Sequence, residues 1–391
     1  MIMKIIKNLI SITAVAFLLY IFTFYIDGEM GIILIAFLIV APIMSLVFTI
    51  YGRNSIKVSF DCEGYVKKGS KIPVTVTVEK NGGFPCAFVE IKPSVSAVFG
   101  KKTKTYRISM LNEKKKNFTF NIDAVTGGNG EISLESVYSC GFLGFLKLKA
   151  KSVLPEPKSV GVIPEIPEIK ASSQLFRAIA DVVMTSDDDE ENDTSMMFSA
   201  NTTPGYEHRE YVTGDPLKRI NWKLSSKRSK LMVRLDESAA SVQPMILLDL
   251  FRNNSVDTEK AVISEEKLLV SVFGLLSLMV KQGLACSFAY YDSSGEIVTE
   301  SVDSPDYPVQ LLLKILSVKV IADRRISLPP ESASVCACVV ATTDAGNGFS
   351  IVIDKIENHE NTSILGISQY SANSTDLPLW YLDEDNNFKR V

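Results

Sequence analysis

Residues 205–237 read GYEHREYVTGDPLKRINWKLSSKRSKLMVRLDE, and we take the rest of the chain to be organised around this stretch. Its acidic residues stand near its two ends, and between Pro216 and Arg234 every charged residue is a lysine or an arginine. The whole chain carries a net charge of −4, so this concentration of cations indicates a dedicated polar surface. The pattern predicts a short helix over 217–226 and a strand over 230–235.

Two apolar runs near the N-terminus predict membrane spans. Residues 9–26 and 31–51 contain no charged side chain, and each is long enough for a helix to cross a hydrocarbon core of about 30 Å. The loop between them is short, which favours a transmembrane hairpin over a cleaved signal peptide. Lysines precede the first run, Arg53 follows the second, and the loop has no cation. The positive-inside rule then predicts a multi-pass protein of the cell membrane with both termini in the cytoplasm.

The region after the spans predicts a β-sandwich. Short runs such as SIKVSFD and KIPVTVTVE alternate apolar and polar residues and are rich in β-branched side chains. Strands at this spacing over about 100 residues suit an immunoglobulin-like sandwich, which we expect to act as a spacer. Prolines and then an acidic run follow it, as in a solvated linker.

The C-terminal part predicts an α/β domain. Apolar runs alternate with amphipathic helical patterns, which favours a parallel sheet covered on both faces. Ligands of such sheets bind beyond the carboxyl ends of the strands. Asp249 and Asp344 both follow predicted strands and fall at that edge.

The central stretch resembles the signature of a known prokaryotic family. Its matching residues are Arg209, Glu210, Tyr211, Gly214, Asp215, Arg219, Asn221, Trp222, Arg228 and Arg234. Their order and spacing strongly resemble the domain-of-unknown-function-58 family, although Ser226-Lys227 replaces the usual alanine before Arg228. The resemblance implies an α/β domain that is von Willebrand factor A-like, and hence Rossmann-like. It also implies association with MoxR-type AAA+ ATPases and no established enzymatic activity.

We therefore expect a multi-domain chain with five parts. These are a transmembrane hairpin (1–53), a β-sandwich (54–154), a Pro-rich and acidic linker (155–204), the signature segment (205–237) and the α/β domain (238–391).

Von Willebrand factor A-like domains often hold a divalent cation through Asp-x-Ser-x-Ser after the first strand, with a later Thr and Asp. Here Asp249 matches, but both serines are missing and Arg252 brings a cation into the loop. Asp344, preceded by Thr342, matches the later acid. Two carboxylates are a poor ligand set for Mg²⁺, so we expect neither a metal nor a cofactor.

Other motifs argue against common activities. The six cysteines are scattered without a CxxC pair, which favours reduced, buried thiols. The Walker, GxGxxG, HExxH and GxSxG motifs do not occur, so we expect no enzyme. The sequence pI is about 5.5 and only one aromatic residue interleaves with the basic stretch, which argues against nucleic acid as a partner.

Two interpretations of the signature charges stay open. Arg209, Glu210, Arg219 and Arg228 either lock the segment onto its domain or form a docking face for an anionic partner. The favoured function is a non-enzymatic, membrane-anchored interaction or assembly protein that binds a protein partner, such as a MoxR-type AAA+ ATPase. The alternatives are a metal-dependent hydrolase centred on Asp249 and Asp344, and recognition of anionic lipid by the basic segment.

Overall fold

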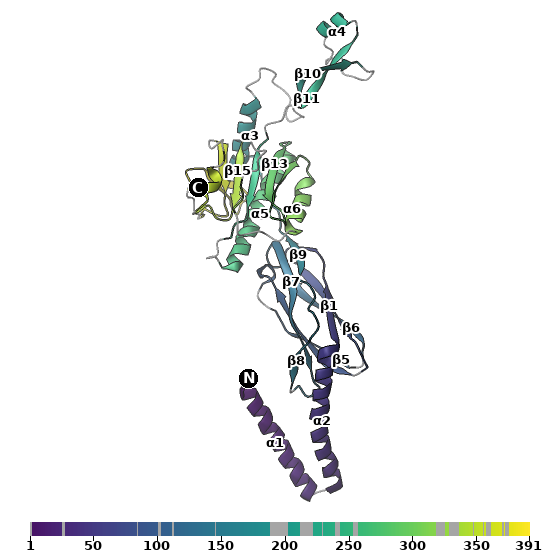
Figure 1. The fold of residues 1–391 in the computed structure, drawn as a ribbon. Helices are drawn as coiled ribbons and strands as arrows, with labels where there is room; N and C mark the ends of the chain where they lie inside the picture. Colours follow the sequence, from purple (N-terminus) through teal and green to yellow (C-terminus); the bar gives the residue numbers. More distant parts are fainter. Residues whose placement is uncertain are drawn as a thin grey trace. The chain divides into compact units, whose positions relative to one another are not determined.

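The computed structural model describes residues 2–391 with gaps at 26–27, 84, 101–102, 112, 145, 188–201, 212–221, 229, 239–242, 253–256, 318–324, 328–335, 347, 355, 357–360, 370 and 372–374. The chain divides into two compact units (Figure 1). The first comprises Met1–Val125 and Gly130–Val160, and the second comprises Thr126–Asn129 and Gly161–Val391.

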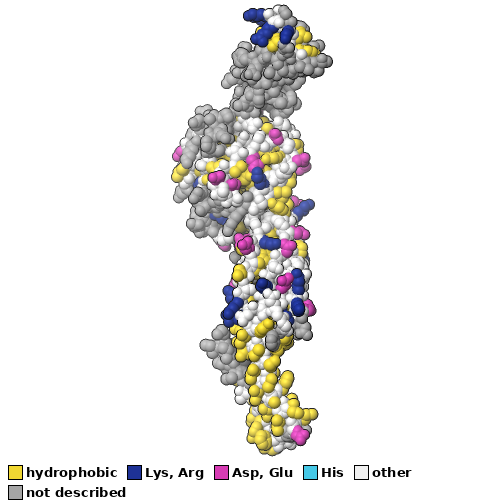
Figure 2. All heavy atoms as spheres, turned by 45° about the vertical axis from the view of Figure 1, so that its right-hand side comes forward, with side chains coloured by type: hydrophobic (Ala, Val, Ile, Leu, Met, Phe, Trp, Pro, Cys, Tyr) yellow, Lys and Arg dark blue, Asp and Glu magenta, His cyan; other side chains and the backbone are white. Residues whose placement is uncertain are grey.

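The first unit begins with two paired helices, α1 (Ile2–Tyr25) and α2 (Gly28–Ser55). A Cβ at Gly31 would lie 2.6 Å from the Cα of Thr23, so the close approach of these helices requires glycine there. Apolar side chains of α2 lie on its surface; Phe37, for example, is 70% exposed. Figure 2 shows hydrophobic side chains gathered over this helical end of the unit.

By length and composition, one of the described helices is able to cross a membrane. It is Glu29–Ser55, with a mean hydropathy of 2.8, while Thr13–Tyr25 is a shorter apolar helix. This finding is weak support for membrane association. A second span and the orientation of the termini stay predictions.

Two β-sheets make up most of the rest of the first unit. One has the order β1-β3-β6, with β1 (Ile56–Asp61), β3 (Lys71–Lys80) and β6 (Lys115–Asp123). The other has the order β2-β9-β7-β4-β5, with β2 (Tyr65–Lys67), β9 (Lys158–Ile163), β7 (Gly128–Cys140), β4 (Cys86–Val95) and β5 (Tyr106–Leu111). The short strand β8 (Lys147–Lys149) pairs with β7, and a 3₁₀ turn, η1 (Ala97–Phe99), follows β4.

The core of this β domain follows the alternating pattern. β1 alternates strictly between buried and exposed residues, and Val74, Val76 and Val78 of β3 are fully buried. Period-2 alternation therefore places one face of each strand in the interior, as expected for a half-buried sheet. The predicted β domain is confirmed at this level, while its immunoglobulin-like character stays a prediction.

The second unit contains a seven-stranded sheet with the order β14-β13-β12-β15-β16-β17-β18. Its strands are β12 (Met245–Asp249), β13 (Cys286–Tyr291), β14 (Ile297–Val302), β15 (Cys338–Thr342), β16 (Thr362–Leu365), β17 (Leu379–Leu382) and β18 (Phe388–Arg390). The five central strands are parallel, but β14 and β18 are antiparallel edge strands. The expectation of a parallel sheet is therefore wrong at both edges, where tight hairpins reverse the chain.

Helices of the same unit are α3 (Gln174–Asp187), α5 (Thr258–Lys281), α6 (Tyr307–Ser317) and α7 (Ser350–Ile353). All five residues of β12 are buried. Ile246 packs into a cluster with Phe273 of α5, whereas Leu247 packs into a second cluster with Phe349. Because successive side chains of a strand point to opposite faces, the sheet has a core on each side.

The signature segment forms a two-stranded antiparallel ribbon. β10 (Thr202–Glu210) pairs with β11 (Met232–Ser238), and α4 (Trp222–Arg228) lies between them in the sequence. The predicted helix over 217–226 overlaps α4 from Trp222 onward, and its earlier residues lie outside the described ones; the predicted strand over 230–235 is present as β11 with shifted bounds. The strand β10 was not predicted.

Candidate functional site

The ribbon places some of the signature residues and leaves others undescribed. His208 lies opposite Arg234 and Glu210 opposite Met232, and the amide of Tyr211 donates to the carbonyl of Leu231 at 2.8 Å. The pairing thus brings the backbone of the RE dipeptide at 209–210 beside β11. Gly214, Asp215, Arg219 and Asn221 lie outside the described residues, as do the side chains of Arg209, Glu210, Trp222 and Arg234.

The helix α4 is held against β11 by a buried hydroxyl. The Ser225 Oγ accepts a hydrogen bond from the amide of Met232 at 2.8 Å, and both residues are buried. On the same helix Lys223, Lys227 and Arg228 are exposed. Lys223 and Lys227 are four residues apart and therefore lie on the same side of the helix. Lys223, Lys227 and Arg228 form what we call the basic face of α4, where Figure 2 shows Lys and Arg side chains gathered.

A second cluster lies at the carboxyl end of the seven-stranded sheet. Asp249 ends β12 with a side chain 1% exposed, and Thr342 is its direct neighbour at the end of β15. Its Oδ2 accepts from the hydroxyl of Thr342 at 2.8 Å, and its Oδ1 accepts from the amide of Ile326 at 3.1 Å. Burial raises the pKa of Asp249, while the hydrogen bonds from Ile326, Arg325 and Thr342 oppose that rise.

Arg325 supplies the positive charge of this cluster. Its Nη1 lies 2.9 Å from Oδ2 of Asp249 and also donates to the carbonyl oxygen of Asp344 at 2.5 Å. Its Nη2 lies 3.9 Å from Oδ2 of the Asp344 carboxylate. The guanidinium carbon sits 4.1 Å from the centre of the Phe251 ring and 5.5 Å from that of Phe349. The cation is therefore held between two carboxylates and two aromatic faces.

Arg252, the cation that the sequence places in the loop after β12, has a different partner. Its guanidinium makes a two-pronged ion pair with Glu265 on α5, with Nη2 2.7 Å from Oε2. The Glu265 side chain is only 7% exposed. A paired geometry of this kind fixes the direction of the arginine. Arg252 therefore fastens the loop to α5.

The sequence indicated Asp249 and Asp344, and the structure brings both to one cation. The sequence did not indicate Arg325 or Glu265. Arg325 lies 76 residues from Asp249 along the chain, so no local spacing links the two. One general signal was present, because a carboxylate at the end of a buried strand requires a cation or several donors.

These residues do not fit a divalent metal while Arg325 is in place. Both oxygens of Asp249 already accept hydrogen bonds, and Oδ1 of Asp344 accepts from the amide of Gly346 at 2.8 Å. Within the described ranges, no group of three or more His, Cys, Asp and Glu side chains comes together as metal ligands. A metal-dependent hydrolase centred on Asp249 and Asp344 gains no support from this arrangement.

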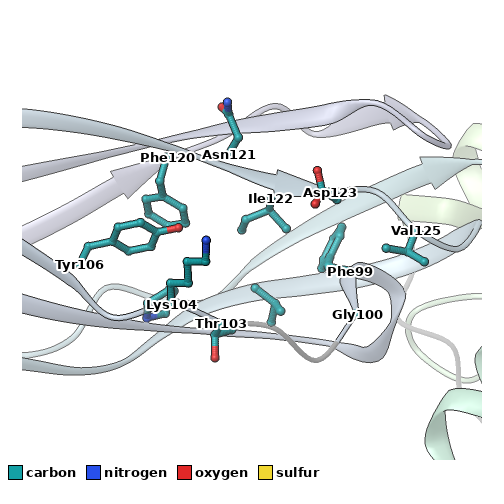
Figure 3. Close-up of a pocket in the computed structure, with 12 residues that line it drawn as sticks. Phe99, Gly100, Thr103, Lys104, Tyr106, Phe120, Asn121, Ile122, Asp123 and Val125 are labelled. Carbon is teal, nitrogen blue, oxygen red and sulfur yellow. The ribbon is translucent and has the colours of Figure 1, made fainter.

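The β domain of the first unit has a cleft of about 330 Å³ between the edge strands β5 and β6 (Figure 3). Phe99, Phe120 and Ile122 contribute apolar surface, and the rings of Tyr106 and Phe120 stack with centroids 4.5 Å apart. Lys104 and Asp123 add polar groups to its lining. The cleft has the chemistry to accept a small apolar group.

Together, the apolar helix, the β domain and the α/β sheet define a multi-domain protein with an N-terminal helix able to enter a membrane. A family model described as "Protein of unknown function DUF58" matches residues 207–286, which run from the ribbon to the start of β13. This match supports the DUF58 family for the chain. None of the curated proteins compared with the chain matches it.

Solved structures resemble the chain only distantly. A cohesin module of a family 33 glycoside hydrolase from Clostridium perfringens is 14% identical with a TM-score of 0.24, over 29% of this chain and 99% of that one. A CARDB domain from Pyrococcus furiosus is 17% identical with a TM-score of 0.22, over 28% and 94%. A beta-glucosidase from Listeria innocua is 11% identical with a TM-score of 0.20, over 28% and 16%. At these scores the similarities carry no argument.

Proposed function

We propose that the protein is a membrane-anchored, non-enzymatic interaction protein whose basic face of α4 binds an acidic protein surface in the cytoplasm. The observation that carries this proposal is the exposure of Lys223, Lys227 and Arg228 on a helix whose other side is held to β11 through Ser225. Exposed charges on a fixed helix keep their spacing, and such charges steer an oppositely charged partner into register. The family resemblance favours a MoxR-type AAA+ ATPase as this partner.

The proposed anchor is a hairpin of α1 and α2 with both chain ends on the cytoplasmic side. The glycine contact at Gly31 supports a pair of helices in close contact, because small residues are what lets helices approach in lipid. The exposed apolar surface of α2 supports burial in lipid, since so much apolar area is costly to leave in water.

The proposed architecture of the soluble part is an immunoglobulin-like sandwich followed by a von Willebrand factor A-like domain. Two sheets with antiparallel strand pairs in one unit support the first assignment. Parallel central strands, with Asp249 directly after the first of them, support the second.

The test is binding of the detergent-solubilised full chain to a purified MoxR-type ATPase. Reversing two charges, Lys227→Glu with Arg228→Glu, should weaken the complex about tenfold, since each exposed pair contributes up to about 1 kcal/mol. The matched control reverses two exposed lysines of α5, Lys260→Glu with Lys267→Glu, and should bind like the wild type. Equal binding by both double variants, or no binding by the wild type, would refute the proposal.

A second arm separates protein from lipid. Vesicles that contain anionic lipid are mixed with the same wild-type and charge-reversed chains at low and high salt. The basic face would be assigned to lipid instead if two results were found together. Anionic vesicles would retain the wild-type chain but not the chain with the α4 charges reversed, and the same reversal would leave binding to the ATPase unchanged.

A further inference from the structure

The oxygens at the end of the seven-stranded sheet converge on one nitrogen atom. The Arg325 Nη1 lies 2.9 Å from Oδ2 of Asp249, 2.5 Å from the carbonyl oxygen of Asp344 and 3.3 Å from the hydroxyl of Thr342. A carboxylate, a carbonyl and a hydroxyl at these distances are the hard oxygen donors that Ca²⁺ and Mg²⁺ select. They stand at the carboxyl ends of parallel strands, where the ligands of such sheets bind.

We propose that this edge of the sheet is a cation site whose resident cation is the protein's own Arg325, and that truncating this side chain turns it into a site for a hard divalent metal ion. Nη1 occupies the centre that an ion would take, and the carboxylate of Asp344 adds a further oxygen donor beside it. The cation is covalently tethered, so neither chelators nor changes in divalent concentration remove it.

The surroundings of Arg325 explain why the guanidinium holds the site in the natural chain. The ring of Phe251 stacks on the guanidinium at 4.1 Å and that of Phe349 lies at 5.5 Å. A planar and weakly hydrated guanidinium gains from such faces, whereas a divalent ion keeps bound water that these rings exclude. The Arg325 side chain is only 14% exposed, so its charge is used inside the domain.

The experiment uses the full chain in detergent, purified once with a chelator and once with Ca²⁺ or Mg²⁺. Wild type should show the same Tm in both and carry no stoichiometric divalent ion. Arg325→Ala should have a lower Tm with chelator, bind about one ion per chain, and rise by roughly 5 to 10 °C at a hundredfold excess over Kd.

Two controls make the result specific. Arg252→Ala also removes a cation from a buried carboxylate, that of Glu265, but leaves Arg325 in place, so it should not respond to metal. The double variant Arg325→Ala with Asp249→Asn should lose the response that Arg325→Ala gains.

Several outcomes would overturn the proposal. A folded Arg325→Ala chain that binds no ion is one, and an equally strong response of Arg252→Ala is another. If Arg325→Ala does not fold under either condition, the wild type decides, because a bound divalent equivalent or a chelator-sensitive Tm shows that Arg325 is not the resident cation.

Discussion

Replacing Asp249 by asparagine tests the central ion pair of the α/β sheet. Asparagine keeps the size of the side chain and one carbonyl oxygen, which is able to go on accepting from the amide of Ile326. It loses the negative charge opposite Arg325. The NH₂ group of asparagine would face the N–H of Arg325 and the O–H of Thr342, which donate to Asp249 in the natural chain. The guanidinium then remains largely buried, with the Asp344 carboxylate at 3.9 Å as its nearest counter-charge.

The expected cost follows from this burial. Removing one partner of a buried ion pair destabilises a protein by about 3–5 kcal/mol. The remaining charge of Asp344 places Asp249→Asn at the low end, about 3 kcal/mol. Arg325→Met costs less, about 2 kcal/mol, because burial raises the pKa of Asp249 and the loss of Arg325 raises it further, which favours the neutral carboxyl. The double variant carries no charge at position 249 or at position 325, so the two effects should overlap by at least about 2 kcal/mol.

The fluorescence of Trp380 reports the unfolding of the sheet that contains the Asp249–Arg325 pair. The chain has two tryptophans, and Trp380 lies buried in β17 of the same sheet, so a Trp222→Phe background leaves it as the sole reporter. Denaturant unfolding of the four chains of the cycle, followed by this fluorescence, gives the coupling free energy. A coupling below about 0.5 kcal/mol would refute the reasoning, since it would mean that Asp249 and Arg325 act independently.

Other parts of the chain yield further expectations. Burial disfavours ionised Glu300, but hydrogen bonds from Lys314, Tyr307 and Tyr290 outweigh it and hold its pKa below the usual value. Ionised Glu300 therefore stabilises the folded chain above its unfolded pKa of about 4.3, and this stabilisation is lost as pH falls through its folded pKa. Glu300→Gln should make the free energy of unfolding fall less steeply as the pH is lowered in this range. Cys62 is the one half-buried thiol among six free cysteines, so a thiol reagent should label it well before the other five in the native chain. A Cβ at Gly141 would lie 2.6 Å from the hydroxyl oxygen of Thr49, so Gly141→Ala should destabilise the packing of α2 on the β domain by about 1–3 kcal/mol, measurable as faster proteolysis between them.

Much of the fold could be predicted from local patterns. The continuous apolar run at β12 and the alternating runs of β1 and β3 report burial directly, because side-chain direction follows strand geometry. Buried free thiols were likewise expected, and five of the six cysteines are buried. These features depend on residues that are close together in the sequence.

The antiparallel edges of the α/β sheet were missed although their turn signals are present. Asp292 accepts hydrogen bonds from the amides of Ser294 and Glu296, and Gly295 has a φ of 82°. Asp383 accepts from Asp385 and Asn387 in the same way at the other edge. Such Asx turns reverse a chain within a few residues and make a hairpin, which adds an antiparallel edge strand to a sheet that was expected to be parallel.

The pairing of Arg325 with Asp249 at the carboxyl end of the sheet could not be predicted in this way. Asp249 and Arg325 meet only because the sheet brings distant segments together, and a sequence contains many arginines that could serve. The sequence drew attention to Asp249 and Asp344, but nothing in it pointed to the side chain that lies between them. Identifying Arg325 required the contacts themselves.

Some cationic side chains of this protein are paired with buried carboxylates and others are exposed, and this difference predicts where an anionic partner would bind. Arg325 and Arg252 are each paired with a buried carboxylate, so an approaching partner meets little net positive charge there. The basic face of α4 is exposed, so its charges are accessible to an oppositely charged partner. Binding at α4 should therefore weaken steeply with added salt, because these charges are screened within about 10 Å at 0.1 M ionic strength. The Asp249–Arg325 pair should be almost unaffected by the same salt, since burial shields it from mobile ions.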